Sequence, residues 1–508
     1  MSLRQSMSGL HTWSGLLVSW LLFVVVFAGS LSCFDKELTR WMLPQLHETA
    51  VPSVNVDQVH AALVERAPRA HAYWMLPPSE RMPYWTAGWV PEDLSAFRSF
   101  LLDAQTGEEL PKTVGGTFFF DLHYGLHAGM PGIYIVGLAG MFMLVALVSG
   151  VIVHRRIFKD FFTLRPGAAR QRAWLDAHNV LGVIGLPFHL LLAYTGLVIF
   201  ITLYMTAGIK ASYRGDAERF EHEVQRAFDR EELGRPAKPP KSLSRMVERA
   251  QAQWGDGSQV GWINLEHPND ASSMVQVRTA VDTRLVNDQR TVSFDAATGA
   301  LLHVQPAYAD GYKTYAWLSG LHMAQFGGSL LRLLYLLLGL AGCGMIFGGL
   351  QVWVAKREAR GSRGLVLVRT LNGAVCGGLP LASLGLLAAS RLLPAELPLR
   401  DRWEATSFVV VWLLALLHAV WRQGSGCLAR EQFAAAAVLA LGLPLLGLFG
   451  PEAGRLGNSL ARGDWMLAGV DLALLASGLI FAALAWRLGR PAAPDTKRQR
   501  VRVEGEFA

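Results

Sequence analysis

The stretch Gly9–Leu31, GLHTWSGLLVSWLLFVVVFAGSL, decides how the chain is organised, because a related stretch, HNVLGVIGLPFHLLLAYTGL, begins at His178. In both, a histidine opens an apolar run and two glycines follow at the same spacings. The matched residues are His11, Gly15 and Gly29 in the first copy, and His178, Gly182 and Gly196 in the second. Such a match indicates an internal repeat.

The residues downstream of each copy repeat as well. His123, Gly140 and Gly150 share their spacing with His322, Gly339 and Gly349. Each half also carries one short turn sequence between its two apolar runs, DAQTG over Asp103–Gly107 and DAATG over Asp295–Gly299. The repeated unit is therefore a helix, an external domain and a second helix.

The composition excludes an ordinary soluble enzyme. Apolar residues make up 52% of the 508 residues, charged residues only 17%, and the mean hydropathy is +0.28. The net charge is +7, but the basic residues crowd beside apolar runs, which indicates membrane topology and contact with lipid rather than nucleic acid. No CxxC spacing occurs, and we interpret the cysteines as small core residues: Cys33, Cys343, Cys376 and Cys427.

The apolar runs predict a mainly α-helical polytopic membrane protein. A four-helix core is expected from tandem repeats of helix, α+β domain and helix, with four further transmembrane helices after it. The first repeat comprises helix 1 (1–34, an uncleaved anchor), an external domain (35–125) and helix 2 (126–156). A basic loop (157–177) leads to helix 3 (178–205), a second external domain (206–322), helix 4 (323–357) and another basic loop (358–369). The four-helix extension covers 370–487 and a tail covers 488–508.

Local patterns give the external domains a mixed α+β character. Alternation over Met274–Arg278 and Thr291–Phe294 predicts strands, and we also expect the run Thr117–Phe120 to be extended. The highly charged segment from Arg214 to Glu232 is predicted to be helical. Basic residues favour the cytoplasmic side, which predicts cytoplasmic N- and C-termini and two domains outside the membrane.

Seven histidines lie in or beside the apolar runs: His11, His123, His127, His154, His178, His189 and His322. An ionisable side chain in a membrane-spanning helix is costly and normally faces a partner inside the bundle. Any one of them alone is well explained as an interhelical hydrogen-bonding residue. The repeat favours a different interpretation, because it would bring matched histidines to the same depth from opposite sides of the bundle.

The predicted pairs are His11 with His178 and His123 with His322. Two opposed imidazoles in a helix bundle are what a six-coordinate b-type haem requires. Nearby glycines would leave room for a flat ring: Gly15, Gly140, Gly182 and Gly339. Because no CxxCH occurs, the haem would not be covalently attached. We therefore predict two haem b groups with these four histidines as ligands of the iron.

Two alternative ligand sets stay open. In the first, His178 and His189 hold two different haems from one helix, with His154 and His127 as the opposing ligands. His189 follows His178 by 11 residues, about 16 Å along a helix and on nearly the same face. In the second, the i, i+4 pair His123 and His127 belongs to a zinc site, for which Asp121 is the acidic neighbour.

Several motifs together carry a resemblance to a known family: HTWSGLLVSWLLFVVVFAGSL, DAQTGE, DAATGA, LHYGLHAG and LVSGVIVHRR. Over about residues 1–357 the chain resembles the PepSY-associated transmembrane family of bacterial inner-membrane proteins. The resemblance implies two PepSY-like periplasmic domains, each a helix on a small antiparallel sheet, and histidine-ligated haem in the core. It also implies siderophore-iron reductase activity, an oxidoreductase that reduces a ferric siderophore or other ferric chelate in the periplasm.

The electron donor must be separate, because no Gly-rich nucleotide loop follows a predicted strand. Membrane quinol and a cytoplasmic reductase are the two possible sources.

The extension over 370–487 departs from the compact family form, and its His418 and Asp471 are interpreted as interface hydrogen-bonding residues. The alternative function is a non-redox PepSY-type regulator that binds a peptide or modulates a peptidase. A transporter is a third alternative, but the paired helices broken by proline beside polar midplane residues that it would need are absent from the sequence, apart from Pro187 beside His189.

Overall fold

The computed structural model describes residues 2–48, 51–95, 97–154, 163–281, 284–358 and 364–490. Within these ranges, eight helical segments are long and apolar enough to cross a membrane. Four belong to the repeat: α1 (Leu3–Ser32), α5 (Gly129–Val153), α6 (Arg170–Ile199) and α12 (Gly328–Glu358). The other four are Leu365–Leu392 (α13, η2 and α14), α15 (Arg400–Trp421), Leu428–Phe449 (α16 and η3) and α18 (Trp465–Leu488). The predicted fold class, a polytopic helical membrane protein, is confirmed.

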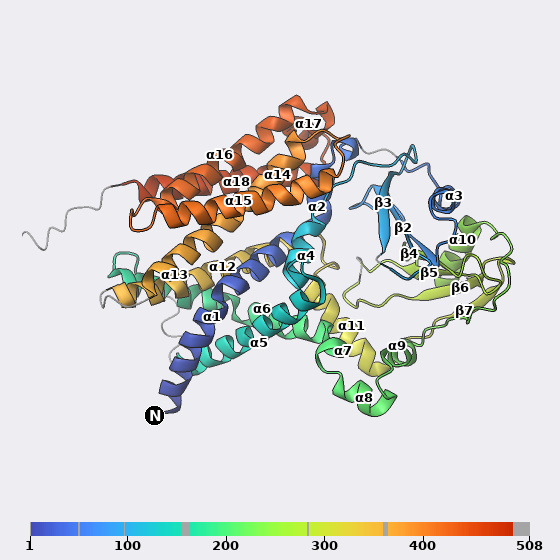
Figure 1. Ribbon diagram of the computed structural model, residues 1–508, viewed down its shortest axis with the longest axis horizontal. Coiled ribbons are helices and arrows are strands. Elements are labelled where there is room, and N and C mark those ends of the chain that lie inside the picture. The colour runs from blue at the N-terminus through green and yellow to red at the C-terminus, as the bar shows by residue number, and fades with distance from the viewer. Residues whose placement is uncertain are drawn as a thin grey trace, which may run out of the picture.

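The repeat helices form a closed four-helix core. Helices α1 and α6 each contact both α5 and α12. The four membrane-spanning segments of the C-terminal extension pack with one another and lie beside this core, away from the sheet (Figure 1). Residues 157–162 and 359–363 of the two basic loops and residues 491–508 of the tail lie outside the described residues. Helix α6 begins at Arg170, before the predicted start at 178, and Arg165, which precedes the helix, forms an ion pair with Asp176 in its second turn.

The two external segments share one seven-stranded antiparallel sheet, with the order β3-β2-β1-β4-β5-β6-β7. The first segment supplies β1 (Ala72–Leu76), β2 (Tyr84–Val90) and β3 (Arg98–Asp103). The second supplies β4 (Val260–Glu266), β5 (Met274–Thr279), β6 (Thr291–Asp295) and β7 (Leu301–Val304). The halves join where β1 pairs with β4, from Ala72 opposite Glu266 to Met75 opposite Ile263. The sequence predicted two domains but not their fusion into one sheet.

One helix from each half packs on this sheet: α3 (Val56–Arg66) and α10 (Leu243–Trp254). Leu63 and Met246 are buried with strand residues such as Ile263 and Val275 in one hydrophobic cluster. Asp57 of α3 also accepts hydrogen bonds from the Leu243 backbone N–H (2.6 Å) and the Ser242 hydroxyl (2.8 Å) at the start of α10. Each half alone would leave part of this core open, so the two halves stabilise each other.

The repeated turn sequences adopt the same conformation. Gly107 and Gly299 both have φ +72°, and their N–H groups donate to the carbonyls of Asp103 (3.0 Å) and Asp295 (2.8 Å). A residue with a Cβ is strained at that φ, which explains the glycine in both turns.

The prediction for Thr117–Phe120 is wrong, because these residues begin helix α4 (Thr117–Gly125). Short apolar runs do not distinguish a strand from a buried helix by periodicity. The buried side chains of Phe118, Phe119 and Leu122 fall on one helical face, which explains the outcome. Helix α11 (Asp310–Met323) takes the corresponding place in the second half, and both helices end at a left-handed residue just before a membrane helix. The segment from Arg214 to Glu232 is helical only in part, at α9 (Ala217–Gln225).

The extension is tied to the repeat at the end of the membrane helices near the sheet. The indole Nε1–H of Trp41, on α2 (Asp35–Met42), donates to Asp471 of α18 (2.8 Å), and the buried Arg40 forms a bidentate ion pair with Asp464. His418 lies 2.9 Å from Glu431 of the next helix. His418 and Asp471 therefore make the interface hydrogen bonds predicted for them. The cysteines are free thiols, of which Cys343 is buried and the others are partly buried.

Candidate functional site: two histidine pairs in the four-helix core

The first pair lies toward the end of the core that is far from the sheet. The ring centres of His11, on α1, and His178, on α6, are 6.2 Å apart. His11 Nδ1 is 2.9 Å from the carbonyl oxygen of Ala146 on α5, and His178 Nδ1 is 2.7 Å from that of Met345 on α12. A carbonyl oxygen can only accept a hydrogen bond, so the Nδ1 that faces it carries the proton and Nε2 keeps its lone pair.

The second pair lies next to the sheet. His123, on α4, and His322, on α11, have ring centres 6.0 Å apart and planes inclined by 29°. His123 Nδ1 is 2.8 Å from the carbonyl oxygen of Val25 on α1. His322 Nδ1 is 3.0 Å from the hydroxyl of Thr195 on α6, which in turn donates to the Leu191 carbonyl (2.7 Å). These bonds fix Nδ1 as the protonated nitrogen here too.

Each of the four imidazoles rests against a glycine on another helix. The nearest ring atom to a Cβ built at the glycine is 3.2 Å away for His11 on Gly150 and for His178 on Gly349. For His123 on Gly29 it is 2.6 Å, and for His322 on Gly196 it is 2.9 Å. In three cases the carbonyl acceptor lies one helical turn before this glycine. The missing Cβ lets the ring approach the helix backbone and reach that carbonyl.

The glycines that face the rings differ from those predicted to do so. Gly339 makes room for Ser30, since a Cβ there would lie 2.1 Å from the Ser30 hydroxyl, and Gly140 and Gly182 face Leu197 and Met345. At Gly15 a Cβ would meet no atom within 4 Å. The repeated spacing had identified both sets of glycines, but spacing alone could not tell which set faces an imidazole.

Both pairs have the separation that a six-coordinate haem requires. A metal–imidazole bond of about 2 Å on each side, plus roughly 1 Å from nitrogen to ring centre, places two axial rings about 6 Å apart. The pairs at 6.2 and 6.0 Å match this value. In all four rings Nδ1 donates to the protein, as ligating histidines normally do, and Nε2 is left for the metal. The residues present therefore fit a b-type haem at each pair.

The other predicted histidines are placed differently. His189 is buried on α6, its Nε2 is 3.1 Å from the Leu338 carbonyl oxygen, and its ring lies against Gly342 of α12. His127 follows α4 and packs its ring on Phe118, with ring centres 4.4 Å apart. His154 is the residue that ends α5. The contacts thus favour the symmetric pairs over the alternative built on His189, His154 and His127, and haem ligation itself stays a prediction.

A zinc site at His123 and His127 finds no support in these contacts, because the two rings have different partners. Among the described residues, a group of three clustered ligands does occur, but at His71, Glu232 and His267 in the external region. Sequence reasoning missed this group, because its members are far apart in the chain. It also missed Thr195 and the carbonyl acceptors, since a backbone acceptor leaves no signature in residue types.

The fold and these pairs define the class of protein: a multi-pass membrane protein with one pair of histidines in a repeated four-helix core and a second pair at the end of that core next to the sheet. Residues 8–356 match the model of the PepSY-associated TM region, and the chain belongs to that family. It is similar to an uncharacterized protein of Pseudomonas aeruginosa, with 28% identity over 387 residues. The similarity covers 74% of this chain and 95% of that relative.

Proposed function

We propose that this protein is a b-type haem protein of a bacterial inner membrane that passes electrons outward to a ferric siderophore or another ferric chelate. The observation that carries the proposal is the pair of ring separations, 6.2 Å for His11 and His178 and 6.0 Å for His123 and His322, at opposite ends of one bundle. Haem bound there supplies one-electron transfer. A haem held by two histidines would supply electron transfer rather than oxygen chemistry.

The chain's own residues have distinct roles in this proposal. His11 and His178 would hold one haem near the cytoplasmic surface, and His123 and His322 would hold the other beneath the external sheet. Their hydrogen bonds to Ala146, Met345, Val25 and Thr195 orient the rings and raise their basicity as ligands. Between His11 and Val25, helix α1 rises about 21 Å, so the two pairs together cover most of the bilayer core.

The sidedness follows from charge. Lys356 and Arg357 end α12, and Arg170 and Arg172 begin α6, all at the helix ends far from the sheet. Basic residues favour the cytoplasm, which supports cytoplasmic termini and a periplasmic sheet. A ferric chelate is polar and too large to cross the bundle, so its reduction belongs at the periplasmic surface. On the other side, a quinol or a cytoplasmic reductase is the donor.

The test uses purified protein in vesicles, reduced chemically and mixed with a ferric siderophore in the absence of oxygen. We expect rapid re-oxidation and release of ferrous iron to a chelating dye, only when the siderophore is on the side of the sheet. The gallium complex of the same siderophore is the matched control, since it has the same shape and charge but cannot be reduced. Re-oxidation by oxygen with no acceleration by any ferric chelate would remove the siderophore assignment and leave a haem protein with another acceptor.

A further inference from the structure

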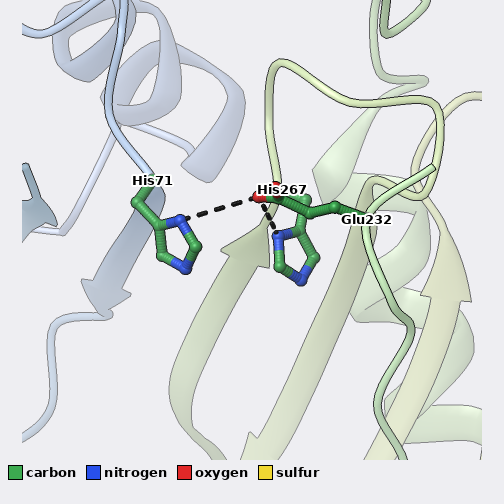
Figure 2. A group of neighbouring side chains, drawn as sticks. All are labelled: His71, Glu232 and His267. Carbon is green, nitrogen blue, oxygen red and sulfur yellow. Dashed lines mark hydrogen bonds and ion pairs between the residues drawn. The ribbon is translucent and has the colours of Figure 1, made fainter. Parts of the chain in front are cut away.

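A second group of metal-type ligands lies in the external region, where the two halves of the sheet meet. His71 directly precedes β1 and His267 directly follows β4. Because β1 and β4 are antiparallel, with Ala72 opposite Glu266, the two histidines lie side by side. Glu232 reaches them from the segment between α9 and α10, and Figure 2 shows the three side chains converging.

The distances suit direct coordination of one ion. Glu232 Oε1 lies 2.9 Å from His267 Nδ1 and 3.7 Å from His71 Nδ1. The imidazole centres are 5.2 Å apart with perpendicular planes, and the three ligand atoms lie within 4.8 Å of one another. Zinc bonds of about 2.0–2.2 Å in tetrahedral geometry separate neighbouring ligand atoms by roughly 3.3 Å. The observed separations bracket that value.

Backbone hydrogen bonds hold the ligands in place. Asp270 accepts from the N–H groups of Leu233 (2.9 Å) and Arg235 (3.0 Å), which anchors the segment that carries Glu232. The His267 N–H donates to the His71 carbonyl (3.2 Å), which links the two histidines directly across the halves. The bond from Leu233, with others from the neighbouring Ser272, keeps the pKa of Asp270 below its usual value, so this anchor is charged at neutral pH.

The ligand types select the class of metal. Two imidazoles and one carboxylate suit zinc and similar divalent transition metals, whereas magnesium and calcium prefer oxygen ligands alone. The side chains of His267, His71 and Glu232 are 17%, 33% and 55% exposed, so an ion from solvent can reach them. Three protein ligands leave a fourth position open.

We propose that His71, Glu232 and His267 bind one divalent transition-metal ion of the Zn²⁺ class, and that this ion joins the two external halves of the chain. This site is separate from the histidine pairs, because it lies in the external sheet. The proposal therefore does not depend on the proposed electron transfer.

The experiment uses the purified full chain after treatment with a chelator. Zn²⁺ is titrated against a competing fluorescent chelator, and bound zinc is counted by mass spectrometry after gel filtration. We expect one zinc per chain in the original protein, and binding weaker by at least about tenfold in His71→Ala and Glu232→Gln. His222→Ala and Glu231→Gln change residues of the same types in the same stretch of chain but outside the proposed ligand set, and these variants should bind zinc as the original protein does.

Two further measurements keep the outcome decisive. His267→Asn should also lose zinc while keeping the fold, because asparagine tolerates the left-handed backbone at this position (φ +49°). X-ray absorption at the zinc edge should show imidazole scattering, a signal that haem does not disturb. The proposal is overturned if the original protein retains no zinc, or if all variants retain it equally.

Discussion

We expect His322→Ala to lower the haem content of the purified protein from about two per chain to about one. His322 is one of two imidazoles whose centres lie 6.0 Å apart, and its Nδ1 is already committed to Thr195. Without the His322 imidazole, His123 would be the single protein ligand at this site. Among the described residues, no other histidine ring contacts the His123 ring. The pyridine haemochrome assay measures haem per chain, and a redox titration should show one of two steps disappear.

His127→Ala is the matched control, because His127 lies close to the same helix end but packs on Phe118. It should retain both haems. The symmetric pairing would be contradicted if His189→Ala lost one haem per chain while His11→Ala lost none. That result would favour the alternative in which one helix supplies ligands to both haems.

Gly29→Leu is expected to remove the same haem as His123→Ala, although it changes no ligand. A Cβ at Gly29 would lie 2.6 Å from His123 Nδ1, far inside van der Waals contact, so the ring must leave the Val25 carbonyl. Leucine has a higher helix propensity than glycine, so a loss would not come from a weakened helix. The measurement is again haem per chain, together with the amount of folded protein in gel filtration.

Gly469→Leu provides the comparison, because Gly469 also lies in a membrane helix and a Cβ there would meet no atom within 4 Å. This variant should keep about two haems. If Gly29→Leu also kept both haems, haem binding would not require the contact between the His123 imidazole and Gly29 of α1. The role assigned to the glycines would then be wrong.

The repeat explains how much of the site could be predicted from the sequence. Identical spacings from His11 to Gly29 and from His178 to Gly196 placed the histidines at matching depths, and the structure pairs them accordingly. What each ring contacts could not be predicted, because the partners are backbone carbonyls such as those of Ala146 and Met345. Backbone acceptors are present at every residue, and only the packing of helices selects among them.

The external region was less predictable for a related reason. Alternation predicted β5 and β6, but the pairing of β1 with β4 depends on two segments almost two hundred residues apart. The cluster of His71, Glu232 and His267 exists only because of that pairing. The run Thr117–Phe120 was predicted to be extended, and burial of Phe118 and Phe119 against the membrane helices makes it helical instead.

In the proposed function, each of the two histidine pairs holds one haem. The most direct test is the absorption spectrum of the purified protein from haem-replete cells, with quantification by pyridine haemochrome. We expect a red protein with about two non-covalent haem b groups per chain, and a Soret band that shifts and sharpens on reduction with dithionite. A colourless, folded protein from such cells would contradict it.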